Sequence, residues 1–354
     1  MSAVGMGDVL DRGILACPSC ASAALLPQQG EVSGGRYKCM SCGHVCLEED
    51  GVLDLRLDTS FDTLLDVEQY DAAHHVTDDS ARLLARLYSD IVTGKGKAAT
   101  GKVLEIGAGS GNLTSGLAEH STFTEIYCSD LSPGFMRLLR QRIDRMNCRN
   151  PVRFYLLDAN ELPFVDGSFD FVFGHSILHH LAHFERAIAA AHRVMKPGGI
   201  AVFGEPVMDT NALISLAAGT IRMMDTVRAV PAFTRREHAI LEVIARRSLE
   251  KRANMEGDRN ELRQIEDKFM FALADMRHLA RELGYSDFDC ISPHVDKGYG
   301  AAVKAGLVQI FRQCVIDPAK LDPYQAVFEN LEMTLGPVAG RRPVGMFSYF
   351  VFIK

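Results

Sequence analysis

The sequence predicts an α/β fold in which a mostly parallel, Rossmann-like sheet carries helices on both faces. A glycine-rich turn joins a strand to a helix in VLEIGAGSGNL, residues 103–113. Strand-like and helical segments then alternate with short links, a pattern typical of a parallel sheet covered by helices. Two longer stretches interrupt this alternation and predict helical insertions into the scaffold.

The strands are predicted from short runs rich in apolar, β-branched and aromatic residues. In chain order they span 103–107, 125–130, 152–158, 168–174, 200–206, 286–292 and 347–354. Apolar residues at helical spacing predict the helices that connect the early strands. These helices span 112–120, 133–146 and 183–195. Pro133 stands at a favourable first helical position, and ARLLARLY at 81–88 predicts a helix before the first of these strands.

Residues 207–284 depart from the alternation, because helical patterns follow one another with no strand between them. They span 209–227, 235–247 and 258–284. We assign 207 to about 272 to a helical lid insertion and the part ending at Leu283 to the next helix of the scaffold. Residues 294–343 are too many for a hairpin link and predict a second insertion.

Length and composition predict a soluble cytoplasmic protein of two domains. The chain has 354 residues, with 38 basic against 45 acidic side chains and a formal net charge of −7. This balance argues against a protein that neutralises many phosphates. The sequence has no apolar run long enough for a membrane span and no signal-peptide pattern at its start. We expect domains at 1–57 and 58–354, and leave the assembly state open, with a homodimer among the options.

Four cysteines near the N-terminus have the spacing of a structural zinc site. Cys17, Cys20, Cys39 and Cys42 form the pattern C-x2-C-x18-C-x2-C. Four thiolates close a tetrahedral Zn²⁺ site and leave no open position for catalysis. The pattern therefore predicts a small zinc ribbon within residues 1–57. His44 and Cys46 remain alternatives to Cys42 as the fourth ligand.

The residues around the glycine turn indicate which nucleotide it binds. The glycines are Gly107, Gly109 and Gly111, whereas a dinucleotide fingerprint needs its last glycine where this chain has Asn112. Acidic residues stand at or near the ends of three successive strands, namely Glu105, Asp130 and Asp158. No basic residue in the turn would balance a pyrophosphate. A ligand with adenine, ribose and a zwitterionic tail fits better, and S-adenosylmethionine has these parts.

Four segments resemble successive motifs of class I S-adenosylmethionine-dependent methyltransferases, in their type-11-like branch. They are VLEIGAGSGNLT, YCSDLSPGFM, LLDANELPFVDGSFDFVFGHSILHHL and VMKPGGIAVFGEP. The resemblance implies a seven-stranded methyltransferase sheet and a set of cofactor-binding residues. Gly107, Ala108, Gly109 and Gly111 would line the methionine and ribose, Asp130 would bind the ribose hydroxyls, Leu131 would flank the adenine, Asp158 and Ala159 would meet its edge, and Tyr70 would close an N-terminal helix over the cofactor.

The methyl acceptor is expected beyond the carboxyl ends of the strands. HSILHHL follows the fourth strand, so His175 and Ser176 face the reaction zone and His175 is a candidate general base. Glu205 ends the fifth strand and either orients the acceptor or caps the next helix. His179 and His180 more often serve packing in such a motif. The apolar faces of the lid either line a pocket or, more commonly, form core.

The favoured function is methyl transfer to an oxygen or nitrogen atom, with carbon also open, of a small-molecule, secondary-metabolite acceptor. A ribosomal-RNA guanine methyltransferase with a zinc ribbon is the first alternative. It is opposed by the ribbon's charge, three basic against five acidic residues between 11 and 50. A non-catalytic cofactor-binding or partner-activating module is the second. A nicotinamide-dependent dehydrogenase is disfavoured by Asn112.

Overall fold

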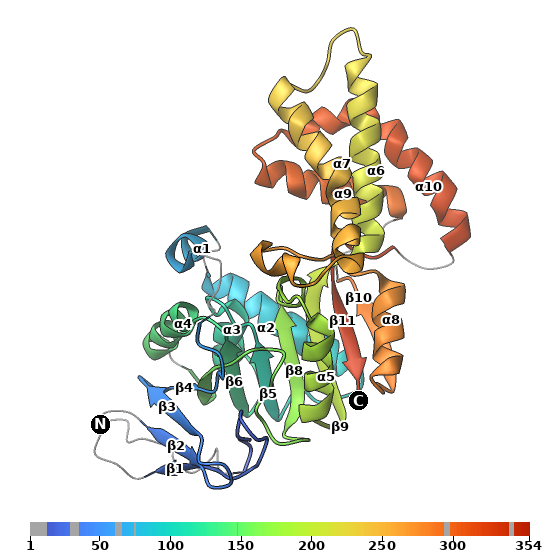
Figure 1. The fold of residues 1–354 in the computed structure, drawn as a ribbon. Helices are drawn as coiled ribbons and strands as arrows, with labels where there is room; N and C mark the ends of the chain where they lie inside the picture. Colours follow the sequence, from blue (N-terminus) through green and yellow to red (C-terminus); the bar gives the residue numbers. More distant parts are fainter. Residues whose placement is uncertain are drawn as a thin grey trace.

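The computed structural model describes residues 13–28, 35–60, 66–73, 76–146, 148–293, 298–339 and 343–354. Residues 1–12 and 29–34 of the predicted ribbon, and 294–297 and 340–342 of the second insertion, lie outside the described residues. The described strands form one eleven-stranded sheet in the order β1-β2-β3-β4-β7-β6-β5-β8-β9-β11-β10 (Figure 1).

Seven of these strands form the scaffold that the alternation predicts. Across the sheet they are β7 (Val152–Leu156), β6 (Glu125–Asp130), β5 (Lys102–Ile106), β8 (Phe169–His175), β9 (Met195–Pro206), β11 (Phe347–Ile353) and β10 (Asp287–Ile291). Neighbours from β7 to β9 pair in parallel, whereas β11 is antiparallel to both β9 and β10. The predicted Rossmann-like fold class is confirmed.

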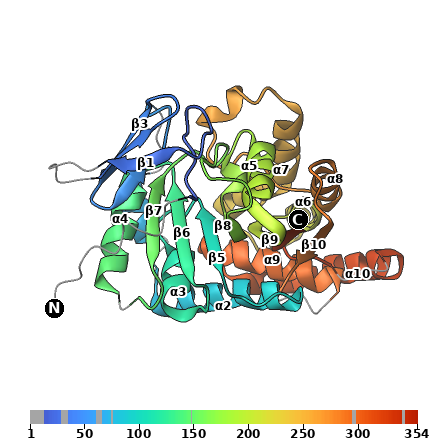
Figure 2. The ribbon, with the colours of Figure 1, turned by 90° about the horizontal axis from the view of Figure 1, so that it is seen from below.

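Helices cover both faces of this sheet, and each face has its own apolar core. One face carries α2 (Asp78–Gly94), α3 (Asn112–His120) and α4 (Pro133–Arg145), and the other carries α5 (Phe184–Val194) and α8 (Leu273–Glu282) (Figure 2). Neighbouring residues of a strand point to opposite faces. Val103 therefore packs with α2 and α3, and Leu104 with the core that contains α5.

Local signals in the sequence explain where two of these helices begin. Thr77 caps α2, and its side chain and that of Ser80 form reciprocal bonds with each other's backbone N–H. Ser132 caps α4 through the N–H of Phe135, and Pro133 follows in the first turn, as the sequence predicts. A further short helix, α1 (Val67–Ala73), precedes α2.

The N-terminal strands extend the same sheet. They are β1 (Leu25–Gln28), β2 (Arg36–Cys39), β3 (Val45–Glu49) and β4 (Val52–Asp54). These four strands form an antiparallel meander, and β4 then pairs in parallel with β7, with Val52 opposite Phe154. Just after β4, Arg56 Nη1 donates to the carbonyl oxygen of Leu131 at 3.2 Å. The ribbon is thus joined to the edge of the scaffold sheet.

The two insertions form one helical bundle with a core of its own. Its helices are α6 (Met208–Thr226), α7 (Arg235–Glu256), α9 (Tyr299–Gln313) and α10 (Gln325–Ala339), with the 3₁₀ turn η3 (Pro318–Tyr324) between the last two. The core contains Ile214, Ile221, Leu241, Ile244, Val303, Leu307, Phe311 and Phe328. Figure 1 shows this bundle projecting beyond the sheet from the side of β9 and β11.

The predicted helix over 258–284 is wrong for its first half. Only a short 3₁₀ turn, η2 (Glu261–Gln264), precedes α8, and residues 265–272 run as an irregular segment. Its backbone bonds to the scaffold instead of to itself: Lys268 N donates to His179 O at 2.8 Å and Phe271 N to Pro206 O at 3.0 Å. Burial of Phe269 and Phe271 accompanies these bonds. Tertiary contacts therefore override the local helical pattern.

No helix among the described residues is both long enough and apolar enough to span a bilayer.

Candidate functional site

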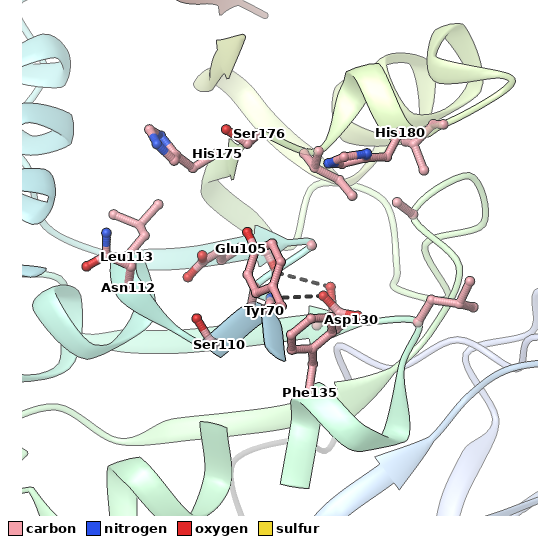
Figure 3. Close-up of a pocket in the computed structure, with 18 of the residues that line it drawn as sticks. Tyr70, Glu105, Ser110, Asn112, Leu113, Asp130, Phe135, His175, Ser176 and His180 are labelled. Carbon is pink, nitrogen blue, oxygen red and sulfur yellow. Dashed lines mark hydrogen bonds between the residues drawn. The ribbon is translucent and has the colours of Figure 1, made fainter. Parts of the chain in front are cut away.

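A cavity of about 360 Å³ opens at the carboxyl ends of β5, β6 and β8. Cavities of this size hold small molecules and are usual at this edge of an open α/β sheet. Its walls come from the turn after β5, the strand ends, α1, the segment after β8, and residues 266 and 268 of the irregular segment. Most of the predicted cofactor residues thus meet His175 and Ser176 in one space (Figure 3).

The glycine turn gives the cavity a wall of bare backbone. Gly107, Ala108 and Gly109 line it, and both glycines have positive φ angles, 68° and 53°. A Cβ on Gly107 would lie 2.5 Å from Ile177, so no larger residue fits there. Gly111 is not among the lining residues, which corrects its expected contact with the cofactor. It precedes α3 with a φ of 89°, and a Cβ there would overlap the side chain of Leu139.

Asp130 is held firmly at the end of β6. Its Oδ2 accepts from the N–H of Gly109 and its Oδ1 from the N–H of Ser132, both at 2.9 Å. Leu131 lines the cavity beside it. The carboxylate therefore couples the glycine turn after β5 to the end of β6.

Asp158 and Ala159 line the adjacent part of the cavity, after β7. Asp158 Oδ1 accepts from the backbone N–H of Asn160 at 2.9 Å and from its side-chain amide at 2.8 Å. This turn fixes the direction of the carboxyl group while leaving Asp158 exposed to a ligand.

Glu105 lies on β5 beneath the turn and is almost completely buried. Thr114 donates its hydroxyl to Glu105 Oε2 at 2.5 Å. Burial raises the pKa of Glu105 to about 8; the Thr114 bond opposes this shift and the charge of Asp130 adds to it. The carboxyl group is therefore mostly protonated at neutral pH in the absence of a cationic ligand.

Tyr70, which the resemblance places over the cofactor, lines the cavity from α1. Its ring packs edge-on against Phe135 of α4, with ring centroids 5.3 Å apart and planes at 80°. Both residues line the cavity, and Figure 3 shows them beside Asp130. Burial raises the pKa of the Tyr70 hydroxyl, with the charge of Asp130 adding to the effect.

His175 and Ser176 line the opposite end of the cavity, at the end of β8. The Nδ1 atom of His175 lies 3.3 Å from the hydroxyl of Tyr88, which itself donates to Gly174 O at 2.7 Å. Burial lowers the pKa of His175 to about 4, against the raising effect of the Glu205 charge. The ring is neutral at neutral pH. Ser176 has a φ of 58°, a strained conformation of the kind that is common at functional sites.

Glu205 does not line the cavity, so its expected contact with the acceptor is wrong. It is completely buried and accepts from the N–H groups of Ile177 at 2.9 Å and Leu178 at 2.7 Å. Its Oε2 also lies 2.6 Å from Nδ1 of His179. Glu205 therefore holds the 3₁₀ turn η1 (Leu178–His180) and one histidine of the motif.

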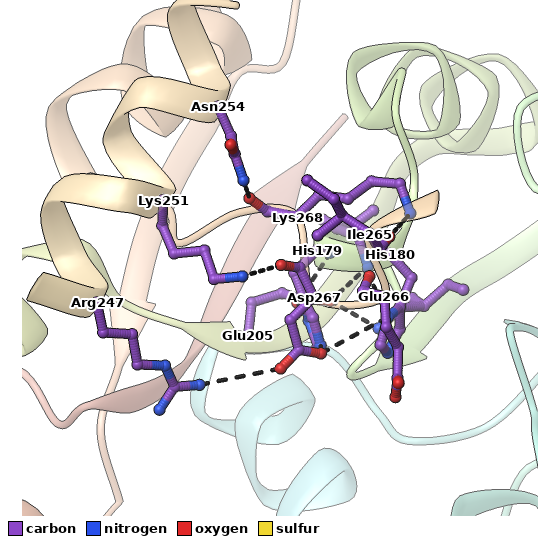
Figure 4. Close-up of polar contacts among 12 residues, drawn as sticks. His179, His180, Glu205, Arg247, Lys251, Asn254, Ile265, Glu266, Asp267 and Lys268 are labelled. Atoms are coloured by element: carbon purple, nitrogen blue, oxygen red, sulfur yellow. Dashed lines mark hydrogen bonds and ion pairs between the residues drawn. The ribbon is translucent and has the colours of Figure 1, made fainter. Parts of the chain in front are cut away.

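His179 connects this turn to the irregular segment through an ion-pair network (Figure 4). Its Nε2 lies 3.5 Å from Oδ1 of Asp267. Burial would lower the pKa of His179, but the charge of Glu205 and the hydrogen bonds that the ring donates to Asp267 and Glu205 raise it to about 9. From α7, Arg247 lies 3.9 Å from Asp267 and Lys251 donates to its backbone oxygen.

The same network contains three groups close enough to one another for a metal ion, His179, His180 and Asp267. Arg247 and Lys251 already compensate the charge of Asp267, and a further cation would meet both of them. We therefore assign these side chains to an ion-pair network that fastens the irregular segment to the scaffold.

Several lining residues were not identified from the sequence. They are Leu84, Ser110, Asn112, Leu113, Ser129, Phe135, Leu157, Ile177, His180, Leu181, Glu266 and Lys268. Most are neighbours of predicted site residues along the chain. Glu266 and Lys268 were missed because their segment was predicted as a helix.

The bundle helices do not supply the walls of this cavity. None of its lining residues among the described part of the chain belongs to α6, α7, α9 or α10. The apolar faces that the sequence offered for a pocket, such as those of Ile214 and Leu241, pack into the bundle core.

The N-terminal cysteines converge as their spacing predicts. Sγ of Cys17 lies 3.6 Å from Sγ of Cys42, and Sγ of Cys20 lies 3.6 Å from Sγ of Cys39. All four sulfur atoms lie within 4.8 Å of one another. Thiolates about 2.3 Å from a tetrahedral Zn²⁺ lie about 3.8 Å apart, so the set fits this ion. Cys46 is buried in the apolar core and His44 is not in the cluster, which leaves Cys42 as the fourth member.

Comparison with known proteins agrees with the resemblance in the sequence. Residues 104–203 match a family model described as a methyltransferase domain. Over 100 residues the chain is 38% identical to the ubiquinone/menaquinone biosynthesis C-methyltransferase UbiE of Burkholderia mallei and of Burkholderia thailandensis. The alignment covers 28% of this chain, and this chain spans about 40% of the length of those relatives. The resemblance to class I methyltransferases is confirmed for this region.

Two solved structures match this chain at low identity and low TM-score. The YcgJ protein from Bacillus subtilis is 16% identical, with 77% of this chain and 98% of that chain covered and a TM-score of 0.42. Phosphoethanolamine N-methyltransferase 2 of Haemonchus contortus is 14% identical, with 82% and 60% covered and a TM-score of 0.40.

Proposed function

We propose that this chain, whose residues 104–203 match a methyltransferase domain, transfers the methyl group of S-adenosylmethionine to a small-molecule acceptor. One observation carries the proposal. A single cavity joins the glycine turn and the strand-end acids Asp130 and Asp158 to His175 at the end of β8, and Lys268 also lines it. Donor and acceptor can therefore lie in one space with the reacting atoms between them.

The first end of the cavity suits the donor. Bare backbone at Gly107 and Gly109 allows close approach of the ligand, and Asp130 can accept from the ribose hydroxyls. Asp158 and Ala159 can meet the adenine edge, and Tyr70 covers the site from α1. Glu105 stands beneath the turn as a group that becomes an anion when a cationic ligand binds.

The chemical step is a displacement at the methyl carbon. The bond from sulfur to the methyl carbon breaks with its electrons going to sulfur, while a new bond forms to the acceptor. Such a step mainly requires that nucleophile, methyl carbon and sulfur are held in line, and burial of the site excludes water. His175 lies at the acceptor end as a neutral imidazole, which can accept a proton but is a weak base.

The acceptor is proposed as a small molecule of secondary metabolism, methylated on oxygen, nitrogen or carbon. Carbon gains support from the relatives, which are named as C-methyltransferases. The ribosomal-RNA alternative finds no support in the mildly acidic chain. It predicts salt-sensitive methylation of RNA transcripts by the purified protein, and that result would replace the present proposal.

Binding of S-adenosylhomocysteine, measured by calorimetry, tests the proposal. Asp130→Asn should weaken binding by about tenfold or more, because the ribose hydroxyls lose a charged acceptor. Asp144→Asn is the matched control, since Asp144 is exposed on α4 and pairs with Arg140. Tight binding of a nicotinamide dinucleotide, with no binding of S-adenosylhomocysteine, would disprove the assignment.

The four cysteines are proposed to hold one structural Zn²⁺, with Cys17, Cys20, Cys39 and Cys42 as its ligands. The support is their mutual spacing together with the closed, all-thiolate donor set. When bound, the ion would stabilise the ribbon, and it would take no part in methyl transfer.

A further inference from the structure

Lys268 is a buried lysine in the wall of the cavity. The residue is only 6% exposed and lines the same space as His175 and His180. Buried lysines are rare unless a charged partner accompanies them. The position of this side chain in the cavity wall therefore needs a physical reason.

Contacts within the chain satisfy only part of this ammonium group. Its Nζ donates to the carbonyl oxygen of Ile265 at 2.5 Å, and it forms no ion pair within 4.0 Å in the part of the chain that the structure describes. An ammonium has three donors. The nearby acids act on it only at longer range, and burial lowers the pKa of Lys268 against the raising effect of Asp267. Figure 4 shows its side chain reaching the backbone of Ile265.

The two histidines that line the cavity with Lys268, His175 and His180, are weak bases. Burial lowers the pKa of His175 to about 4, and it also lowers the pKa of His180, to which the charge of His179 contributes. A neutral hydroxyl of ordinary acidity would therefore be deprotonated slowly here. An acceptor that is already acidic would need no such base, provided that a cation stabilises its conjugate base.

We propose that Lys268 binds an anionic oxygen of the acceptor, so that the acceptor is a phenol or an enol bound as its oxyanion. This inference rests on the proposed methyltransferase function. The hydroxyl proton leaves to solvent on binding, and the electron pair of the oxyanion, or of a carbon atom conjugated with it, attacks the methyl carbon. The sulfonium takes up the electrons of its broken bond. Positive and negative charge cancel, and methylation on carbon then releases the ring proton to water.

The irregular segment keeps this lysine in place. Asp267 is fastened by His179, Arg247 and Lys251, and Lys268 N donates to His179 O. Asn254 of α7 donates to the carbonyl oxygen of Lys268 at 2.7 Å. The bundle thus acts on the cavity through this segment, although its helices do not line it.

para-Nitrophenol is a suitable probe, because its phenolate absorbs visible light and the phenol does not. Protein saturated with S-adenosylhomocysteine is titrated with the probe at a pH below the probe's own pKa. The wild type should bind it and increase the phenolate absorbance. Lys268→Met should bind it about 10- to 100-fold more weakly and lose the absorbance change, because a charge-assisted hydrogen bond is removed. Lys268→Arg should retain much of the effect.

Lys196→Met is the matched control, since Lys196 pairs with Asp170 and does not line the cavity. Calorimetry with S-adenosylhomocysteine and thermal unfolding are measured on every variant. If the wild type does not bind S-adenosylhomocysteine, the proposed function itself is overturned. If that binding is intact, four results would each overturn the role of Lys268. The wild type fails to bind para-nitrophenol, or binds it without forming the phenolate. Lys268→Met behaves like the wild type, or the protein prefers the uncharged ether para-nitroanisole. The groups Asp267, Glu266, Lys251 and His180 surround this lysine, so the pH is held constant across variants.

Discussion

Glu105 is a buried carboxyl group whose protonation affects stability. Its pKa rises from the ordinary value of 4.5 to about 8 in the folded chain. Between these values the folded state holds a proton that the unfolded state has lost, so stability falls as the pH rises through this range. Glu105→Gln should therefore unfold at a higher temperature than the wild type near pH 8, with a smaller difference near pH 5. Differential scanning calorimetry at both pH values checks this, and a difference that does not change with pH would refute it.

His175 is expected to titrate far below the usual range of histidine. Burial lowers its pKa to about 4. In an NMR titration its ring resonances should show no inflection near pH 6.5. His175→Ala tests for a base: a loss of kcat of about 100-fold with little change in S-adenosylhomocysteine affinity would assign proton transfer to His175 and contradict loss of the proton to solvent. Normal turnover by this variant would show that the reaction needs no base at this position.

Some of the site could be predicted from single residues and some could not. The positions of Asp130 and Asp158 follow from strand ends, because parallel strands place their carboxyl ends at one edge. Glu205 is also at a strand end, yet its carboxylate turns inward to the N–H groups of Ile177 and Leu178. The sequence alone does not indicate that the Glu205 side chain turns inward. Lys268 depends on contacts between distant segments, which no local pattern encodes.

The proposed zinc site of the N-terminal ribbon can be tested by replacing single cysteines. Cys39→Ser should reduce the bound zinc well below the roughly one equivalent expected for purified protein. Cys46→Ser is the control, because Cys46 is buried in the core and is not in the cluster of sulfur atoms. Metal content by plasma emission spectroscopy distinguishes the two variants. Retention of zinc by Cys39→Ser together with its loss in Cys46→Ser would show that Cys46, and not Cys39, is a ligand.

The irregular segment from residue 265 to 272 is held by a network whose charge depends on pH. The pKa of His179 rises from 6.5 to about 9 in the folded chain. The stability that this adds is fully present below pH 6.5 and is lost as the pH rises through about 9. Asp267→Asn should therefore be less stable than the wild type near neutral pH and lose less stability on going to alkaline pH.

Asp275→Asn is the control for this comparison, since Asp275 pairs with Arg252 in an exposed ion pair. Urea unfolding across the pH range measures both variants. Parallel curves for Asp267→Asn and the wild type would mean that His179 is not coupled to Asp267.

For the whole molecule, the alternation of strands and helices was sufficient to predict the scaffold. Apolar runs such as those around Leu104 and Phe171 are buried on both faces, and strands of this type belong in a parallel sheet. The union of two insertions into one bundle could not be predicted, because α6 and α9 meet only through long-range packing. The parallel pairing of β4 with β7 could not be predicted for the same reason.

The bundle is expected to stabilise the protein without touching the donor. Leu241→Ala should lower the free energy of unfolding by about 2–5 kcal/mol, because it leaves a cavity in the bundle core. Its affinity for S-adenosylhomocysteine should be unchanged. Val243→Ala on the exposed side of α7 is the control, with little effect expected on either quantity. Denaturation measures the free energy of unfolding, and calorimetry measures the affinity. A large loss of affinity in Leu241→Ala would show that the bundle shapes the donor site.

The attachment of the ribbon to β7 has a consequence for biosynthesis. β4 leaves the ribosome about 100 residues before its partner β7, a delay of roughly 5 to 20 seconds at ordinary translation rates. During this interval the ribbon strands can form their own meander, while β4 presents an unpaired edge. This strand is only three residues long, which limits its pairing with other nascent chains. Metal loading can therefore precede completion of the sheet, and β7 then docks onto an ordered template.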